Sequence, residues 1–241
     1  MKLQKLSAIA LMVGAVFSTS VLADDAADKK FTDDASYAVG ALLGTDLKGL
    51  VDAQKDVINY DKERVLAGVA DALNGKVDLS ENKALVETLN KVDEKLKAAS
   101  QAKAAEQAKQ AKEDGAKLVA EFKKKSGVKE TKSGLLYRVE KEGSGDAIKD
   151  TDVVKVHYTG KLPNGKVFDS SVERGQPVEF ALNQVIQGWI EGLQLIKKGG
   201  KIELVIPAEL AYGDQEMGAI PANSTLYFEV EVLDVNPAAK K

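Results

Sequence analysis

Apolar residues repeat at three different spacings along the chain, which divides it into three stretches after residue 23. Between about residues 31 and 75, two short amphipathic patterns with helical spacing predict two helices of about three turns each. Asp61 and Arg64 mark the start of the second helix, and Asn74-Gly75 is typical of a helix end. We therefore expect residues 24–79 to be a region of short helices.

The second stretch, residues 80–126, consists mainly of strong helix formers and contains no proline and one glycine, Gly115. At 1.5 Å per residue, it predicts a connecting helix of roughly 70 Å. Residues 97–117 carry no side chain more apolar than alanine. We expect this middle part to be exposed to solvent all round, between two packed ends. The seam of apolar residues near the start comprises Leu85, Leu89, Val92 and Leu96.

The third stretch, residues 127–241, changes to an alternation of apolar and polar residues. In residues 152–159 every second side chain is apolar from Val154 onward, which predicts a strand with one buried face. The same period recurs in residues 202–206 and 226–232. Half-buried antiparallel strands are the simplest account of this pattern.

One short helix interrupts these strands. Residues 188–196 predict it, with Trp189, Leu193 and Ile196 on its inner side. The predicted fold class is therefore α+β: a C-terminal antiparallel sheet wrapped on one short helix, preceded by an all-α N-terminal arm with a long connecting helix.

The first 23 residues carry the features of a secretory signal peptide. Lys2 and Lys5 precede an apolar run, residues 6–17, and small residues end at Ala23 as at a cleavage site. The run is shorter than the ~20 residues of a transmembrane helix, and no later segment approaches that length. We expect an exported chain that starts at Asp24 and has no transmembrane segment.

Charge and cysteine content narrow the range of partners and compartments. The chain has 34 basic and 37 acidic residues and a net charge of −3, a balance that argues against nucleic acid as a partner. It contains no cysteine, so we expect neither a disulfide framework nor a lipid-modified cysteine. Together with the signal peptide, these features favour a bacterial periplasm.

Several common chemistries have no residues to support them. His157 is the only histidine and there is no thiol, so a zinc site or a Cys/His dyad lacks its ligands. Residues 160–166 read G-x-x-x-x-G-K, but Val167 stands where a phosphate-binding loop requires Ser or Thr. We therefore expect chemistry without nucleophile, metal or cofactor.

Five short motifs in the last hundred residues resemble the signature of the FKBP family of peptidyl-prolyl cis/trans isomerases, in order and in spacing. The resemblance implies the family's fold over residues 127–241 and isomerisation of X-Pro bonds in unfolded or partly folded polypeptides. The motifs are Val156-His157-Tyr158-Thr159-Gly160, Phe168-Asp169-Ser170-Ser171, Val185-Ile186-Gln187-Gly188-Trp189, Lys198-Gly199-Gly200-Lys201 and Ala211-Tyr212-Gly213.

This reaction needs a pocket of particular shape and polarity. Rotation of an X-Pro bond has to overcome ~18–20 kcal/mol, because it breaks amide resonance. In the twisted state the carbonyl loses conjugation and the prolyl nitrogen becomes pyramidal. A dry pocket that grips the proline ring and leaves the carbonyl free to rotate would favour that state over the planar one.

Carried over position by position, the resemblance implies a role for ten residues. Trp189 would be the pocket floor, while the Ile186 N–H and the Tyr212 hydroxyl would bind carbonyl groups of the substrate. Asp169, held by Arg174, would lie beside the twisting carbonyl. The implied catalytic residues are Phe168, Asp169, Ile186 and Tyr212, and the implied substrate-binding residues are Tyr158, Arg174, Val185, Trp189, Ile220 and Phe228.

Two departures from the family pattern concern specificity. Val178 stands where many members carry an aromatic residue, and residues 213–221 are acidic and lack a His-Pro pair found in some members. Ile220 in this stretch is expected to be a wall residue of the pocket. These departures leave open the substrate preference and the affinity for macrolide inhibitors, which are further candidate ligands.

The helical half resembles the arms of the FkpA and Mip (macrophage infectivity potentiator) group of bacterial FKBPs, whose arms dimerise. The resemblance implies a homodimer formed through residues 24–79. The alternative is that the seam of residues 85–96 packs on the two short helices of its own chain. A second function also stays open: a dimeric holdase chaperone whose arms bind unfolded clients. Location in the periplasm or association with the outer membrane or cell surface are both compatible with the sequence.

Overall fold

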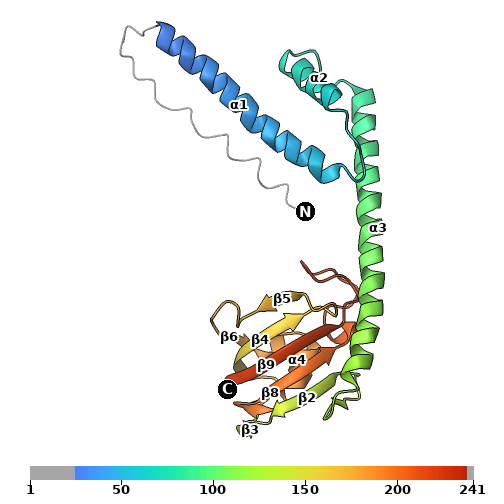
Figure 1. Cartoon of the computed structure of the whole chain (residues 1–241), viewed down its shortest axis with the longest axis vertical. Helices are drawn as coiled ribbons and strands as arrows, with labels where there is room; N and C mark the ends of the chain where they lie inside the picture. Colours follow the sequence, from blue (N-terminus) through green and yellow to red (C-terminus); the bar gives the residue numbers. More distant parts are fainter. Residues whose placement is uncertain (1–24, 238–241) are drawn as a thin grey trace. The chain divides into compact units, whose positions relative to one another are not determined.

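The computed structural model describes residues 25–237, and the predicted signal peptide lies outside the described residues. The described residues up to Lys83 form one compact unit, and those from Ala84 onward form another. No helix within residues 25–237 combines the length and apolar character needed to cross a bilayer. Figure 1 shows the elements in chain order.

The first unit contains two helices, α1 (Asp25–Gln54) and α2 (Lys62–Leu73). The predicted limits of α2 are confirmed: the Asp61 side chain accepts a hydrogen bond from the Arg64 N–H at 3.0 Å, and Asn74 caps the other end. The prediction of about three turns for the first helix is wrong, because α1 has 30 residues. Three single glycines weaken this helix by about 1 kcal/mol each without ending it.

Most large apolar side chains of α1 and α2 are exposed, and α2 has no buried residue. These two helices therefore bury little apolar surface within one chain. The exposed residues are Phe31, Tyr37, Val39, Leu42, Leu43 and Leu50 in α1, and Leu66, Val69 and Leu73 in α2.

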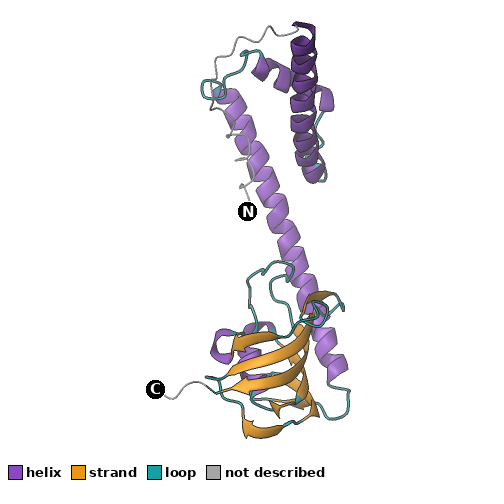
Figure 2. Ribbon diagram, turned by 90° about the vertical axis from the view of Figure 1, so that its left-hand side faces the viewer, coloured by secondary structure: helices purple, strands orange, loops and turns teal. Residues whose placement is uncertain are grey.

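The second unit combines the long helix α3 (Lys83–Phe122) with an antiparallel sheet. Among the described residues, seven strands form this sheet in the order β1-β2-β8-β9-β4-β5, and β6 also pairs with β4 (Figure 2). A separate pair joins β3 and β7. The strands are β1 (Lys129–Glu130), β2 (Leu136–Lys141), β3 (Ser144–Ala147), β4 (Val153–Lys161), β5 (Val167–Ser170), β6 (Val178–Ala181), β7 (Lys197–Lys198), β8 (Lys201–Ile206) and β9 (Leu226–Asn236).

The inner face of the sheet packs on one short helix, α4 (Gln187–Leu193). Burial alternates along β4 as predicted, with Val154, Val156 and Tyr158 inside. A Cβ atom added at Gly192 would lie 2.7 Å from the Leu204 side chain of β8, so the backbone of α4 packs directly against this side chain. The predicted α+β fold class is confirmed.

The outer face of the sheet is covered by the end of α3. Phe122 packs edge-to-face on Tyr227 of β9 at 6.2 Å and forms a second buried cluster with Leu136 and Val205. Strand β8 is therefore buried on both faces, and the prediction that this strand is half-buried is wrong. The alternation could not report this, because the second face is closed by a helix distant in sequence.

The middle of α3 also departs from the prediction. Ala111 and Gly115 are buried, although residues 97–117 were expected to be exposed all round. Small side chains read as solvent-tolerant in a sequence, but they also allow a helix to lie close to another backbone. At Ala111 and Gly115, the small side chains allow α3 to lie close to another part of the chain.

A buried carboxylate ties α3 to the sheet. Glu203 on β8 is 5% exposed and accepts hydrogen bonds from Arg138, from the Tyr227 hydroxyl at 2.6 Å and from the Lys125 ammonium at 3.3 Å. Burial would raise the pKa of Glu203, but these three donors outweigh it and lower the pKa to about 2. Lys125, just beyond α3, is thus anchored to a charge inside the sheet layer.

Candidate active site

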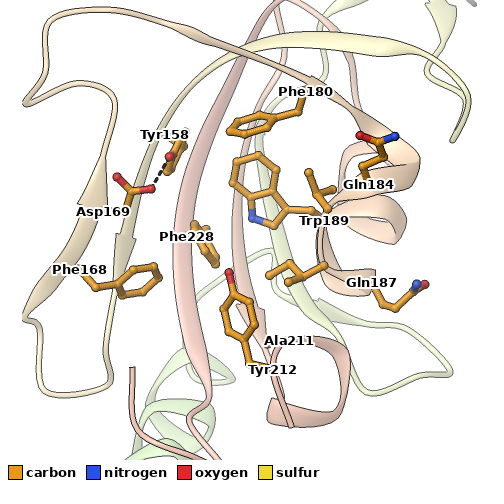
Figure 3. A pocket seen from close by; sticks show the side chains of 12 residues that line it. Tyr158, Phe168, Asp169, Phe180, Gln184, Gln187, Trp189, Ala211, Tyr212 and Phe228 are labelled. Atoms are coloured by element: carbon orange, nitrogen blue, oxygen red, sulfur yellow. Dashed lines mark hydrogen bonds between the residues drawn. The ribbon is translucent and has the colours of Figure 1, made fainter. Parts of the chain in front are cut away.

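An open cavity of about 590 Å³ lies between the inner face of the sheet and α4 (Figure 3). Strands β4, β5, β6 and β9 contribute to it, together with α4 and the turn that follows η2 (Ala208–Leu210). Its lining is mostly apolar and aromatic. The lining residues are Tyr158, Phe168, Asp169, Phe180, Gln184, Val185, Ile186, Gln187, Trp189, Ala211, Tyr212 and Phe228.

The floor of the cavity is Trp189, which α4 presents toward the sheet. Its ring meets Tyr158, Phe228 and Phe180 edge-to-face, at centroid distances of 5.2, 5.3 and 5.7 Å. Within residues 25–237, the buried Trp189 Nε1 has no hydrogen-bond partner. Four aromatic rings thus enclose a space whose base is apolar apart from this indole N–H.

One wall depends on a glycine in β4. The rings of Phe168 and Phe228 meet edge-to-face at 5.6 Å. A Cβ atom added at Gly160 would lie 2.6 Å from Phe168 Cζ and 2.7 Å from Phe228 Cε1. The glycine that ends the Val-His-Tyr-Thr-Gly motif is therefore required for both rings to rest against the strand.

A charged group lies on the rim beside this wall. The Tyr158 hydroxyl donates a hydrogen bond to the Asp169 carboxylate, and the Arg174 guanidinium donates to Asp169 and, at 3.1 Å, to the Tyr158 oxygen. Burial opposes ionisation of Asp169, but the hydrogen bonds from Tyr158 and Arg174 outweigh it and lower the pKa of this carboxyl. Asp169 is consequently a fixed negative charge at neutral pH.

Two hydrogen-bond donors stand on the other side of the opening. The Tyr212 hydroxyl points into the cavity (Figure 3), and burial raises the pKa of Tyr212, so the group is a neutral donor. Ile186 caps α4, and its carbonyl accepts from the N–H of Trp189 at 2.9 Å. The Ile186 N–H itself meets no acceptor within the described part of the chain.

The structure brings most of the sequence-derived site residues together. Two do not line the cavity: Arg174 reaches it only through Asp169 and Tyr158, and Ile220 is buried in the core, where it forms a bridge with Met217. The residues at the cavity surface are Tyr158, Phe168, Asp169, Val185, Ile186, Trp189, Tyr212 and Phe228.

Four residues of the lining were not among the predicted site residues: Phe180, Gln184, Gln187 and Ala211. A signal existed for Phe180, because Val178 and Phe180 alternate with polar residues in a short apolar segment. Gln184 and Gln187 flank the Val185-Ile186 pair, where amide side chains give no pattern of their own. Their position at the rim could be found only from the fold.

The antiparallel sheet on one helix and the aromatic cavity are the features expected of an FKBP-type isomerase. Comparison with known protein families gives the same class. A family described as "FKBP-type peptidyl-prolyl cis-trans isomerase" matches residues 145–233. A second, described as "Domain amino terminal to FKBP-type peptidyl-prolyl isomerase", matches residues 32–139. The chain belongs to the FKBP family and is a peptidyl-prolyl cis-trans isomerase.

Individual relatives extend this similarity over the whole chain. The chain is 62% identical to a "Probable FKBP-type peptidyl-prolyl cis-trans isomerase" of Haemophilus influenzae, over 100% of both proteins. It is 44% identical to FkpA of Escherichia coli K12 over 216 residues, which is 89% of this chain and 80% of that protein. The crystal structure of Escherichia coli FkpA superposes with a TM-score of 0.69 and covers 86% of this chain and 97% of that chain. The resemblance seen in the five motifs is confirmed.

Proposed function

We propose that the aromatic cavity binds the proline ring of an X-Pro peptide on Trp189 while the preceding carbonyl rotates. The observation that carries this proposal is the distribution of polarity. Four aromatic rings form the base, where the described part of the chain leaves the Trp189 N–H unpaired, and the charged groups and the other donors stand at the rim. A proline ring has a matching apolar surface and no N–H that would need a partner.

The apolar base lowers the rotation barrier through the polarity of the amide. Amide resonance places partial negative charge on oxygen and partial positive charge on nitrogen, and this separation decreases when the bond twists. Transfer into a dry aromatic pocket therefore disfavours the planar amide more than the twisted one. The pocket stabilises the transition state relative to the ground state.

The rim groups hold the rest of the substrate while one carbonyl moves. Asp169 lies beside the rotating carbonyl, in an orientation set by Tyr158 and Arg174. The Tyr212 hydroxyl and the Ile186 N–H bind other carbonyl groups of the peptide. Val185 and Phe168 close the sides. Ile220 belongs to the loop after Tyr212 and supports that side of the pocket from the core.

Exchange NMR on a short X-Pro peptide tests these assignments. Phe168→Ala removes a wall and should lower kcat/KM by about tenfold, since the loss of an aromatic contact with the substrate of about 1.4 kcal/mol corresponds to that factor. Tyr212→Phe removes one hydroxyl and should lower it about fivefold. The matched control is Tyr137→Phe in β2, outside the cavity. Unchanged catalysis in both site variants would remove the support for the pocket assignment.

We also propose that the substrates are unfolded or partly folded exported polypeptides in the periplasm. The predicted signal peptide and the absence of cysteine support this location. Fractionation of cells that express the full chain should recover it, without the first 23 residues, in the periplasmic fraction. Recovery in the outer-membrane fraction, or cleavage by protease added to intact cells, would indicate surface association instead.

A homodimer through residues 24–79 is the third part of the proposal, and the exposed apolar side chains of α1 and α2 support it. The same surfaces favour a second candidate function, a holdase that binds unfolded clients. The variant Phe168→Ala separates the two functions. A holdase would still suppress aggregation of a model client after this substitution, whereas folding help that depends on isomerisation would be lost.

A further inference from the structure

The single glycine of α3, Gly115, is buried and stands about two turns before the end of this 40-residue helix. Glycine in a helix interior costs roughly 1 kcal/mol relative to alanine, because it loses more backbone entropy. The surrounding residues are mostly alanine, lysine and glutamine, which are strong helix formers. Gly115 therefore calls for a local reason.

That reason is a contact with Thr225 in the segment before β9. A Cβ atom at position 115 would lie 2.5 Å from Thr225 Oγ1 and 2.9 Å from Thr225 Cβ, closer than such atoms can approach. The glycines of α1 provide a comparison. A Cβ added at Gly40, Gly44 or Gly49 would meet nothing within 4 Å. Unlike these three glycines, Gly115 lets the helix backbone lie against another part of the chain.

Thr225 ends the segment that begins directly after the pocket residue Tyr212. Hydrogen bonds close this segment on itself: the Asn223 N–H donates to the Gly213 carbonyl at 2.8 Å, and the Ser224 hydroxyl donates to the Pro221 carbonyl at 2.7 Å. Asn223 has a φ of 61°, a left-handed turn conformation that asparagine adopts more readily than most residues. Residues 213–224 therefore form one closed loop, which begins directly after Tyr212.

The loop also faces α3 across a small cavity. This cavity of about 250 Å³ separates Ala111 and Asp114 of α3 from Ala219 and Pro221 of the loop. Ala219 and Pro221 thus face α3 across this space, and the close approach of the loop to the helix is at Thr225. Its other face reaches the core through Ile220, which is buried.

We propose that Gly115 is a positioning residue for the isomerase, because the close contact of α3 with Thr225 fixes residues 213–224 and so fixes the Tyr212 hydroxyl at the pocket. This inference rests on the proposed role of Tyr212 in binding a substrate carbonyl. The floor and walls are held by the sheet and α4, so displacement of the loop alters the Tyr212 side of the pocket alone. The long helix thereby becomes part of the catalytic domain's support.

A double-mutant cycle in the full chain tests the inference. Gly115→Ala should displace the loop and lower kcat/KM about threefold to fivefold, approaching the effect of Tyr212→Phe. In the Tyr212→Phe background the same substitution should have almost no further effect, because the group that it displaces is already absent. The matched control on the exposed face of α3 is Lys109→Ala, which should leave kcat/KM unchanged.

A reciprocal exchange distinguishes positioning from general destabilisation. Thr225→Gly removes both atoms that obstruct a new Cβ, so Gly115→Ala combined with Thr225→Gly should restore kcat/KM to within twofold of the original chain. Thr225→Gly alone should reduce it by leaving a gap. If Gly115→Ala prevents folding, Thr225→Gly alone, combined with Tyr212→Phe, still completes a cycle.

The outcomes separate this inference from the proposed function. If Tyr212→Phe itself has no effect on kcat/KM, the proposed role of Tyr212 fails. If Tyr212→Phe lowers kcat/KM but the effects of Gly115→Ala are absent, are additive, or persist in the exchange variant, the positioning role of Gly115 is overturned. Loss of catalysis in Gly115→Ala that the exchange restores supports it.

Discussion

The Tyr158 hydroxyl of β4 donates a hydrogen bond to the Asp169 carboxylate of β5, the neighbouring strand of the same sheet. Arg174 donates to both groups from the turn that follows β5. The three side chains form a closed set on the rim of the cavity. Because each orients the others, the carboxylate is held in place before a substrate arrives, which lowers the cost of ordering it during catalysis.

The ionisation of Asp169 gives a prediction for the pH dependence of catalysis. Its pKa is lowered from the usual value of 3.8, so Asp169 stays charged at every pH above that value. We expect kcat/KM to be flat between about pH 5 and 8. Arg174→Gln removes a donor and should raise the pKa of Asp169, which moves the acidic limb of the profile to higher pH. Exchange NMR measures kcat/KM over this range without a coupled protease.

Asp169→Asn provides the control for this profile. It should lower kcat/KM by about tenfold, if one charge-assisted interaction of about 1.4 kcal/mol is lost. It should also abolish the acidic limb in the Arg174→Gln background. An acidic limb that does not move in Arg174→Gln would contradict the role assigned to this pair.

Binding to the pocket should be visible in tryptophan fluorescence. Trp189 is the only tryptophan in the sequence, and it forms the cavity floor. A proline-containing peptide that stacks on it should change the emission in a saturable way, since it displaces water from the indole. Phe168→Ala should weaken the apparent affinity by tenfold or more, whereas Tyr137→Phe should not change it. A titration without any spectral change would contradict binding at this floor.

The buried Glu203 predicts how the attachment of α3 depends on pH. Its pKa is about 2 in the folded chain and has a usual value of 4.5, so its stabilisation is complete above pH 4.5 and is lost as the pH falls toward 2. Glu203→Gln should lower the free energy of unfolding by about 2 kcal/mol at pH 7, because Arg138 and Lys125 lose their anionic partner. Urea denaturation followed by Trp189 fluorescence measures this.

Glu231→Gln is the matched control for that experiment. Glu231 lies exposed on β9, so its substitution should change the free energy of unfolding by less than about 0.5 kcal/mol. The Glu203→Gln variant should also lose most of the change in stability between pH 4.5 and 2. A variant as stable as the original chain at pH 7 would show that the network contributes nothing to the fold.

Oligomeric state tests the proposed role of α1 and α2. Sedimentation of the chain without its signal peptide should give a mass twice that of one chain. Leu42→Lys combined with Leu66→Lys should shift it toward the monomer, because both residues are more than 50% exposed in one chain and would be buried in a dimer. Val172→Lys, at a residue 57% exposed in the second unit, should keep the mass of the original chain. A single-chain mass at all concentrations would contradict the dimer.

The catalytic half was largely predictable because its signals are local. The alternation in β4 depends on the strand's own pleat, and the motif residues Phe168, Val185 and Trp189 carry side chains whose chemistry suits an apolar pocket. Short-range spacing therefore identified the buried face, and the resemblance of the five motifs to the family implied most of the cavity lining. The placement of Ile220 differs, since its position in a loop gave no indication of whether it faces the cavity or the core.

The helical half was less predictable because its contacts are distant in sequence. Ala111 and Gly115 have side chains too small to form a hydrophobic pattern, and only the fold places them against residues 219–225. The sequence predicted a half-exposed strand around Val205, whereas in the structure Phe122 of α3 covers this residue. The length of α1 was underestimated for another reason: the apolar pattern that predicted this helix covers only part of its 30 residues.

Strand β9 pairs along most of its length with β8 on one side and β4 on the other, although it follows both of them in the chain. A polypeptide that emerges N-terminus first cannot complete the centre of this sheet until residue 236 is available. Until then β4 and β8 have unpaired edges, which are open to association with other chains. The helices α1 and α2 form from local contacts and precede every strand. During its own synthesis the chain therefore passes through a stage in which the arm is present and the proline pocket is not.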